Sequence, residues 1–200
     1  MKKVLLINGS PHRDGNTAIA LKELAAQLAV CGVESELYWS GTGPLYGCVA
    51  CNGCNKTGNC VMAQDVNELA ERLRAADGLI VGSPVYYAGP TGTLCAFLDR
   101  LFRAHSAEFD GKPAAAVAVC RRGGASATFD RLNKYITYNQ TPVVTSVYWN
   151  STHGRKPEDL EQDKEGLQVM RTLGRNMVQM LQLERLNGQT EPRVMTDYIR

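Results

Sequence analysis

The chain has 200 residues, a formal net charge of +2, and 44% hydrophobic and 21% charged residues. This composition is typical of a globular domain, and the near-neutral charge, without a basic stripe interleaved with aromatic residues, argues against nucleic acid as a partner. The apolar run after Lys2 and Lys3 is too short for a secretory signal, and no segment has the length of a membrane span. We therefore expect one cytoplasmic domain, residues 1–200.

Hydrophobic patterning predicts five strands alternating with helices. Apolar runs predict buried strands at 3–8, 78–82, 114–120 and 143–148, and alternating residues predict an edge strand at 33–39. Helices are expected from the opening loop to Gly32 and over 65–76, 91–104, 125–138 and 157–183, the last with a methionine stripe facing the core. An insertion loop spans 40–64, and the polar tail 185–200 is either loose or docked on a partner subunit. Such alternation predicts a parallel doubly wound α/β sheet, order 2-1-3-4-5, with helices on both faces.

The loop after the first strand has the composition of an anion site. Residues 9–17 read Gly-Ser-Pro-His-Arg-Asp-Gly-Asn-Thr and open a helix whose first amides lack backbone acceptors. Ser10 and Thr17 add hydroxyls, Asn16 an amide and Arg13 a charge, so we expect a phosphate here. The triphosphatase and dinucleotide glycine motifs are both missing. The alternative is an ordinary polar connection.

Two further loops converge with it if the strand order holds. Ser83–Pro90 follows the third strand, where Tyr86 and Tyr87 offer flat surfaces for stacking or simply pack under the loop. Cys120–Ala125 follows the fourth strand, where Gly123 and Gly124 let the backbone approach a ligand. The arginine pair before these glycines either stabilises an anionic ligand or is solvated.

A cysteine run lies between these loops. Cys48-x2-Cys51-x2-Cys54-x5-Cys60 provides the four thiolates that a [4Fe–4S] cluster needs. Zinc sites usually pair two C-x2-C units across a longer span, and a loop of free cysteines is a third possibility. The remaining cysteines, Cys31, Cys95 and Cys120, are expected to be small apolar fillers.

Three motifs together resemble the NADPH-dependent FMN reductase branch of the flavodoxin-like superfamily. They are Gly-Ser-Pro-x-x-x-Gly-Asn-Thr, Ser-Pro-x-Tyr with Phe97-Leu-Asp-Arg100 downstream, and Arg-Arg-Gly-Gly, while the cysteine run resembles the iron–sulfur flavoproteins of that branch. The resemblance implies a flavodoxin-like fold, bound FMN, and a homodimer or homotetramer with the flavin near a subunit boundary. The cofactor-binding residues it implies are Ser10, His12, Arg13, Asn16, Thr17, Pro84, Val85, Tyr86, Tyr87, Arg122, Gly123 and Gly124.

The expected function follows from this resemblance. An FMN enzyme would oxidise NAD(P)H and pass the electrons to a quinone, a nitro or azo compound, or free flavin, with the flavin and no catalytic side chain carrying the chemistry. Trp149 and His153, after the fifth strand, are candidates for the substrate side of the ring. The alternatives are an electron-transfer protein that uses a [4Fe–4S] cluster and ferredoxin-type partners, and a flavin-binding sensor or storage module.

Overall fold

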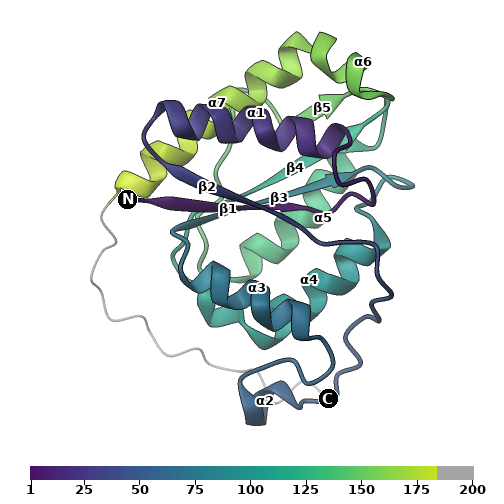
Figure 1. Ribbon diagram of the computed structural model, residues 1–200, viewed down its shortest axis with the longest axis vertical. Coiled ribbons are helices and arrows are strands. Elements are labelled where there is room, and N and C mark those ends of the chain that lie inside the picture. Colours follow the sequence, from purple (N-terminus) through teal and green to yellow (C-terminus); the bar gives the residue numbers. More distant parts are fainter. Residues whose placement is uncertain (184–200) are drawn as a thin grey trace, which may run out of the picture.

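The structure is a computed structural model that describes residues 1–183; the predicted tail at 185–200 lies outside the described residues. The described chain forms a five-stranded parallel sheet in the order β2-β1-β3-β4-β5, which confirms the predicted topology (Figure 1). The strands are β1 (Lys3–Asn8), β2 (Glu34–Trp39), β3 (Gly78–Pro84), β4 (Ala114–Cys120) and β5 (Ser151–His153).

Helices cover both faces of this sheet (Figure 1). One face carries α1 (Asn16–Val30), α6 (Pro157–Gln162) and α7 (Lys164–Gln182), which pack on Val4, Leu6 and Ile80 of the strands. The other carries α3 (Gln64–Arg74), α4 (Gly92–Ala104) and α5 (Ala125–Tyr138), with the 3-10 turn η1 (Ser106–Phe109). Alternate residues of β1 point to opposite faces, so the buried strands are apolar on both sides. None of the helices within residues 1–183 has the length and apolarity to cross a membrane.

The prediction of the fifth strand at 143–148 is wrong. The chain pairs with the start of β4 at one isolated bridge, where the Ala114 N–H donates to the Pro142 carbonyl at 2.9 Å and the Val144 N–H donates to the Ala114 carbonyl at 2.8 Å, and it then leaves the sheet. It returns at Asn150, whose side-chain amide donates to the Ala116 carbonyl at 3.0 Å, and β5 begins at the next residue. Ser146 bonds the Val169 carbonyl of α7 at 2.7 Å, so α7 holds the excursion away from the sheet. At Ala116, the Asn150 side chain thus takes the place of the backbone hydrogen bond that a strand at 143–148 would make.

Two helix boundaries also differ from prediction. The expected helix over 157–183 is divided at Asp163, whose carboxylate accepts the Gly166 N–H at 3.0 Å and starts α7 as an N-cap. The helix predicted over 65–76 is α3, which begins one residue earlier, at Gln64, and ends at Arg74. The methionine stripe of α7 is confirmed as core, because Met170 and Met177 are fully buried. The insertion loop contains a short helix, α2 (Cys54–Thr57), that the sequence did not predict.

Candidate functional site

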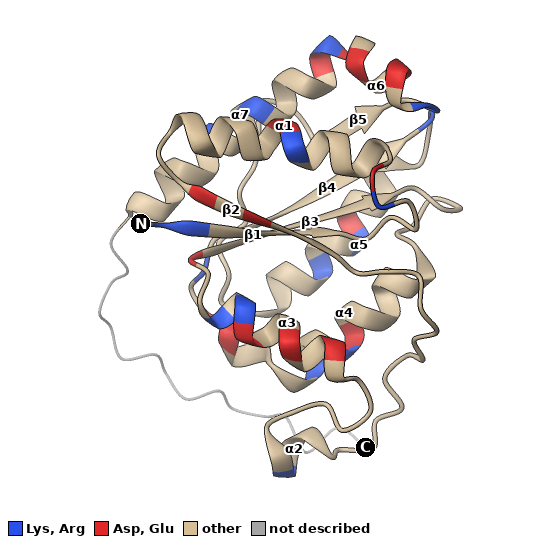
Figure 2. Ribbon diagram, viewed as in Figure 1, with Lys and Arg blue, Asp and Glu red and all other residues tan. Residues whose placement is uncertain are grey.

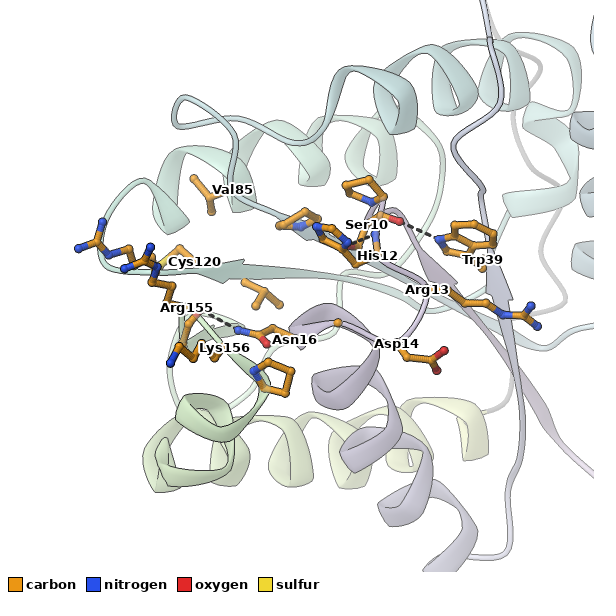
Figure 3. Close-up of a pocket in the computed structure, with 17 residues that line it drawn as sticks. Ser10, His12, Arg13, Asp14, Asn16, Trp39, Val85, Cys120, Arg155 and Lys156 are labelled. Carbon is orange, nitrogen blue, oxygen red and sulfur yellow. Dashed lines mark hydrogen bonds between the residues drawn. The ribbon is translucent and has the colours of Figure 1, made fainter.

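A cavity of about 850 Å³ lies at the carboxyl ends of the strands (Figure 3). Its size is within the range of cofactor pockets, and it lies where doubly wound sheets bind ligands. It is lined by Ser10, Pro11, His12, Arg13, Asp14, Gly15, Asn16, Trp39, Pro84, Val85, Val119, Cys120, Arg121, Gly154, Arg155, Lys156 and Pro157. The walls therefore come from the loops after β1, β3, β4 and β5 and from the end of β2.

The start of α1 faces this cavity without a cap. Gly15 is the N-cap residue, and within residues 1–183 no side chain accepts a hydrogen bond from the first turn. Thr17 is only 1% exposed, and its hydroxyl has no hydrogen-bond partner among the described residues. Unpaired buried donors are costly, and free helix amides attract anions. This end of α1 therefore has the donors that a bound anion would satisfy.

Side chains from neighbouring strands fix the opening loop. The Ser10 N–H donates to the Asn8 side-chain oxygen at 3.0 Å, and the Asn8 amide donates to the Arg13 carbonyl at 3.0 Å. Trp39 Nε1 donates to the Ser10 carbonyl at 2.7 Å, and the Arg13 guanidinium lies 5.9 Å from the Trp39 ring centroid (Figure 3). These bonds join only protein groups, so the loop takes its shape from its own side chains and from β2.

The turn between β5 and α6 forms the opposite wall. Asn16 Nδ2 donates to the Gly154 carbonyl at 2.7 Å and ties the start of α1 to this turn. The N–H groups of Arg155 and Lys156 both donate to Asp159 Oδ2 at 3.0 Å, which places two cationic side chains on the rim. Figure 2 shows basic residues at this turn and at the opening loop. The lining thus holds four cationic side chains, those of Arg13, Arg121, Arg155 and Lys156, against the one carboxylate of Asp14, and this cationic excess favours a phosphate.

The loops after β3 and β4 pack against each other beside the cavity. Tyr86 and Gly89 exchange backbone hydrogen bonds at 2.8 and 2.9 Å around a turn in which Tyr87 and Ala88 have positive φ angles of 50° and 58°. Gly124 has φ 85°, and a Cβ there would lie 2.9 Å from a Val85 methyl, so the close approach requires glycine.

Some predicted residues meet at the cavity and others do not. Those that line it are Ser10, His12, Arg13, Asn16, Pro84 and Val85. Tyr86 and Tyr87 lie out on an exposed turn, and Arg121 lines the cavity where Arg122 was predicted. Three other predicted residues follow lining residues in the sequence but do not line the cavity themselves: Thr17, Gly123 and Gly124.

Trp149 and His153 are also outside the lining. Trp149 lies on the exposed excursion before β5, and the backbone N–H of His153 donates to Asp163 Oδ2 at 2.6 Å. The misplaced fifth strand explains why the sequence suggested these residues instead of Arg155 and Lys156. Trp39 was missed as well, although the carboxyl end of a strand paired with β1 is a position that reaches this cavity.

The cysteine segment, residues 46–62, lies beyond α3 and α4, away from the cavity (Figure 1). Cys48, Cys51, Cys54 and Cys60 line one small void of about 20 Å³ with apolar neighbours and two arginines of α4. All four thiols are free, and Ala50 and Asn52 between them have positive φ angles of 52° and 58°. Within residues 1–183 no three His, Cys, Asp or Glu side chains are close enough to hold a single metal ion.

Comparison with known proteins decides the family. A family model described as NADPH-dependent FMN reductase matches residues 2–156. The chain belongs to the NADPH-dependent FMN reductase family. Iron–sulfur flavoproteins are among its relatives: one from Methanocaldococcus jannaschii is 32% identical over 90% of this chain and 98% of its own length. Another, from Methanosarcina thermophila, is 28% identical over 92% of this chain and 98% of its own length.

Solved structures show the same fold. A flavoenzyme NAD(P)H:(acceptor) oxidoreductase from Paracoccus denitrificans has a TM-score of 0.66 at 20% identity, covering 90% of this chain and 97% of its own. A flavodoxin from the domain Archaea has a TM-score of 0.62 at 16% identity, covering 90% of this chain and 99% of its own. The predicted flavodoxin-like fold is thus confirmed.

The residues of this FMN reductase cavity fit FMN. The uncapped start of α1, the unpartnered Thr17 hydroxyl and the cationic rim suit a phosphate, and Pro84 and Val85 offer an apolar surface in the same cavity. The cysteine segment provides the four thiols of an iron–sulfur cluster in an apolar surrounding. Its void has room for no more than about one water molecule, so cluster binding requires the four thiols to move apart.

Proposed function

We propose that this chain is an FMN-dependent NAD(P)H oxidoreductase that passes electrons to a small acceptor such as a quinone, a nitro or azo compound, or free flavin. The observation that carries the proposal is the cavity at the uncapped start of α1, with its cationic rim and with the buried, unpartnered Thr17 hydroxyl in the first turn of that helix. Membership of the NADPH-dependent FMN reductase family supports it. A relative named as an NADPH azoreductase from Bacillus, 33% identical over 66% of this chain and 65% of its own length, supports the range of acceptors.

The bound flavin would supply the hydride and electron chemistry, so the protein has to bind, orient and shield it. The α1 amides, Ser10 and Thr17 would hold the phosphate, and Arg155 and Lys156 would neutralise its charge. Asn16 keeps these two groups in register through its bond to Gly154. Val85 and the turn after it would contact the ring edge from one side. The Val85 N–H donates to the Val119 carbonyl at 2.8 Å, and this bond fixes the start of the turn on β4.

Steady-state kinetics test this function. FMN-loaded protein should oxidise NADPH or NADH continuously when a quinone or an azo dye is supplied. The sensor alternative predicts FMN binding with negligible turnover against every acceptor, and that result would end the enzyme proposal.

The cysteine segment favours a second function, an electron-transfer flavoprotein that also holds a [4Fe–4S] cluster on Cys48, Cys51, Cys54 and Cys60 and exchanges electrons with ferredoxin-type proteins. The convergence of four free thiols on one void supports it, as do the iron–sulfur flavoprotein relatives. Free thiols also suit a reducing compartment such as the cytoplasm. Iron and sulfide analysis of anaerobically purified protein distinguishes this function; iron-free protein after reconstitution rejects it.

We also propose a homodimer or homotetramer. Val147, Tyr148 and Trp149 form an exposed apolar excursion on the described surface, and Tyr87 protrudes from the turn beside the cavity. Exposed apolar clusters of this kind mark interaction surfaces. Light scattering that gives a monomer at micromolar concentration would reject this assembly.

A further inference from the structure

Arg100 is a buried cation at the junction of α4 and the cysteine segment. The residue is only 3% exposed, and its guanidinium donates three hydrogen bonds. Nε bonds the Tyr46 carbonyl at 2.5 Å, Nη2 the Gly47 carbonyl at 2.8 Å, and Nη1 the Cys60 sulfur at 3.4 Å. One side chain thus holds both ends of the segment that contains the four cysteines.

This guanidinium has no carboxylate partner. None of the ion pairs formed within residues 1–183 includes Arg100. Its neighbours are two neutral carbonyls and a sulfur, together with apolar side chains such as Val61. A buried charge is costly unless a charge of opposite sign compensates it. Within residues 1–183, therefore, no anionic side chain compensates the charge of Arg100.

Arg103, one turn further along α4, provides the contrast. It also borders the void, but it is exposed and donates to the Asn52 side-chain oxygen at 2.8 Å without touching a sulfur or a segment carbonyl. Water solvates this second charge, so it needs no internal anion. The two arginines form a matched pair on one helix face.

We propose that Arg100 is the internal counter-ion and positioning residue of a thiolate-bound iron–sulfur group held by Cys48, Cys51, Cys54 and Cys60. The inference rests on the second function proposed above. Thiolates and a cluster are together anionic, so they supply the charge that the guanidinium lacks. The bonds to Tyr46 and Gly47 fix the entry of the segment, and the bond to Cys60 fixes its exit.

Two separable effects follow from this arrangement. The positive charge and the N–H donated to sulfur favour the reduced group, which carries one more negative charge than the oxidised group. The fork of N–H groups on the guanidinium holds the two ends of the segment together and therefore slows the loss of iron. The charge of Arg100 thus affects the reduction potential of the cluster, and the fork affects how long the protein retains its iron.

Anaerobically reconstituted full-length protein tests both effects through three variants. Arg100→Gln removes charge and fork, Arg100→Lys keeps the charge but not the fork, and Arg103→Gln is the control. The measurements are iron and sulfide content, the midpoint potential from an EPR-monitored dithionite titration, and the rate of iron loss to a chelator. We expect Arg100→Gln to lower the ratio of reduced to oxidised cluster at fixed potential about tenfold, which is 59 mV for a one-electron couple.

The lysine variant keeps the test decisive even where the glutamine variant fails to fold. It should retain the wild-type potential and lose iron about tenfold faster than wild type, while Arg103→Gln changes neither quantity. A lysine variant with wild-type retention overturns the positioning role. A lysine variant whose potential falls by about 59 mV overturns the counter-ion role, as does a fall of equal size in Arg103→Gln.

FMN content and NADPH oxidation, measured on the same samples, separate this inference from the proposed enzyme. Iron-free wild-type protein that still binds FMN and oxidises NADPH overturns the role of Arg100 and leaves the enzyme proposal intact. Protein that takes up iron but binds no FMN rejects the enzyme proposal and leaves the role of Arg100 standing.

Discussion

The cavity at the strand ends and the cysteine segment are held in opposite ways. The cavity is formed by the ends of five paired strands and by hydrogen bonds such as those of Asn8, Asn16 and Trp39, so bonds within the protein hold its walls. The cysteine segment contributes no fully buried side chain between Cys48 and Cys60, and it is held by the bonds of Arg100 at its two ends and by those of Asn67 to the Cys60 backbone. One site is completed by the fold; we infer that the other is completed by its ligand.

The largest expected effect separates the two regions. Cys51→Ser should abolish cluster binding, lowering iron from about four atoms per chain to less than about one, because a cubane needs all four thiolates. FMN affinity should stay within about twofold, since Cys51 is exposed and outside the cavity lining. Iron analysis and an FMN titration check both quantities. Cys31→Ser, an exposed cysteine outside the segment, is the control and should keep its iron.

The next effect concerns the bond between the start of α1 and the turn after β5. Asn16→Ala removes the 2.7 Å bond to the Gly154 carbonyl and should lower the free energy of unfolding by about 1 kcal/mol. FMN affinity should fall at least about tenfold, because two walls of the cavity lose their register. Asn176→Ala removes an equivalent 2.7 Å bond to the Thr145 carbonyl far from the cavity. Equal loss of FMN affinity in both variants would contradict the account.

Thr17→Val should separate binding from stability. The Thr17 hydroxyl lacks a partner among the described residues, so valine should leave the ligand-free protein equally stable or more stable by up to about 1 kcal/mol. FMN affinity should still fall about tenfold, because the phosphate loses a donor. Urea unfolding and FMN titration measure the two quantities, and Thr17→Ser should retain near wild-type affinity. A destabilised valine variant with unchanged FMN affinity is the contrary result.

A smaller effect is expected from the rim charges. Arg155→Gln should weaken FMN binding about threefold at low salt, and the difference should shrink as salt screens the exposed charge. The same substitution at Arg175 on α7, outside the cavity, should have no effect on FMN. Titrations at low and high ionic strength make the comparison. A salt-independent loss would place Arg155 in a structural role.

The smallest effect concerns pH and the support of the cysteine segment. Burial lowers the pKa of His105 from its ordinary value of 6.5, and its Nε2 lies 3.0 Å from the Asn67 oxygen that also accepts the Cys60 N–H. The folded protein therefore holds this imidazole neutral. Its contribution to stability is complete above the unfolded pKa and falls as the pH drops from there toward the folded pKa.

Urea unfolding at about pH 7.5 and about pH 5.5 measures this contribution. Wild type should lose more stability on acidification than His105→Gln, which cannot take up that proton. An equal pH dependence in the two proteins would remove His105 from the account.

Residue patterns predicted most of the fold because buried parallel strands are continuous apolar runs and their order follows from right-handed crossovers. They failed at the fifth strand, where Val143–Tyr148 reads as a strand but the Asn150 side chain and the contacts of α7 decide the pairing. That single error hid Arg155 and Lys156. The opening loop was readable because local chain geometry builds it, whereas Trp39 and Arg100 act across long sequence separations that no local pattern encodes.

The most direct test of the account compares FMN with riboflavin, which has the same ring but no phosphate. We predict that the protein binds about one FMN per chain and binds riboflavin at least about a hundredfold more weakly, because the start of α1 and the cationic rim are built for the phosphate. Equal affinity for the two flavins, measured by fluorescence titration, would contradict the central claim.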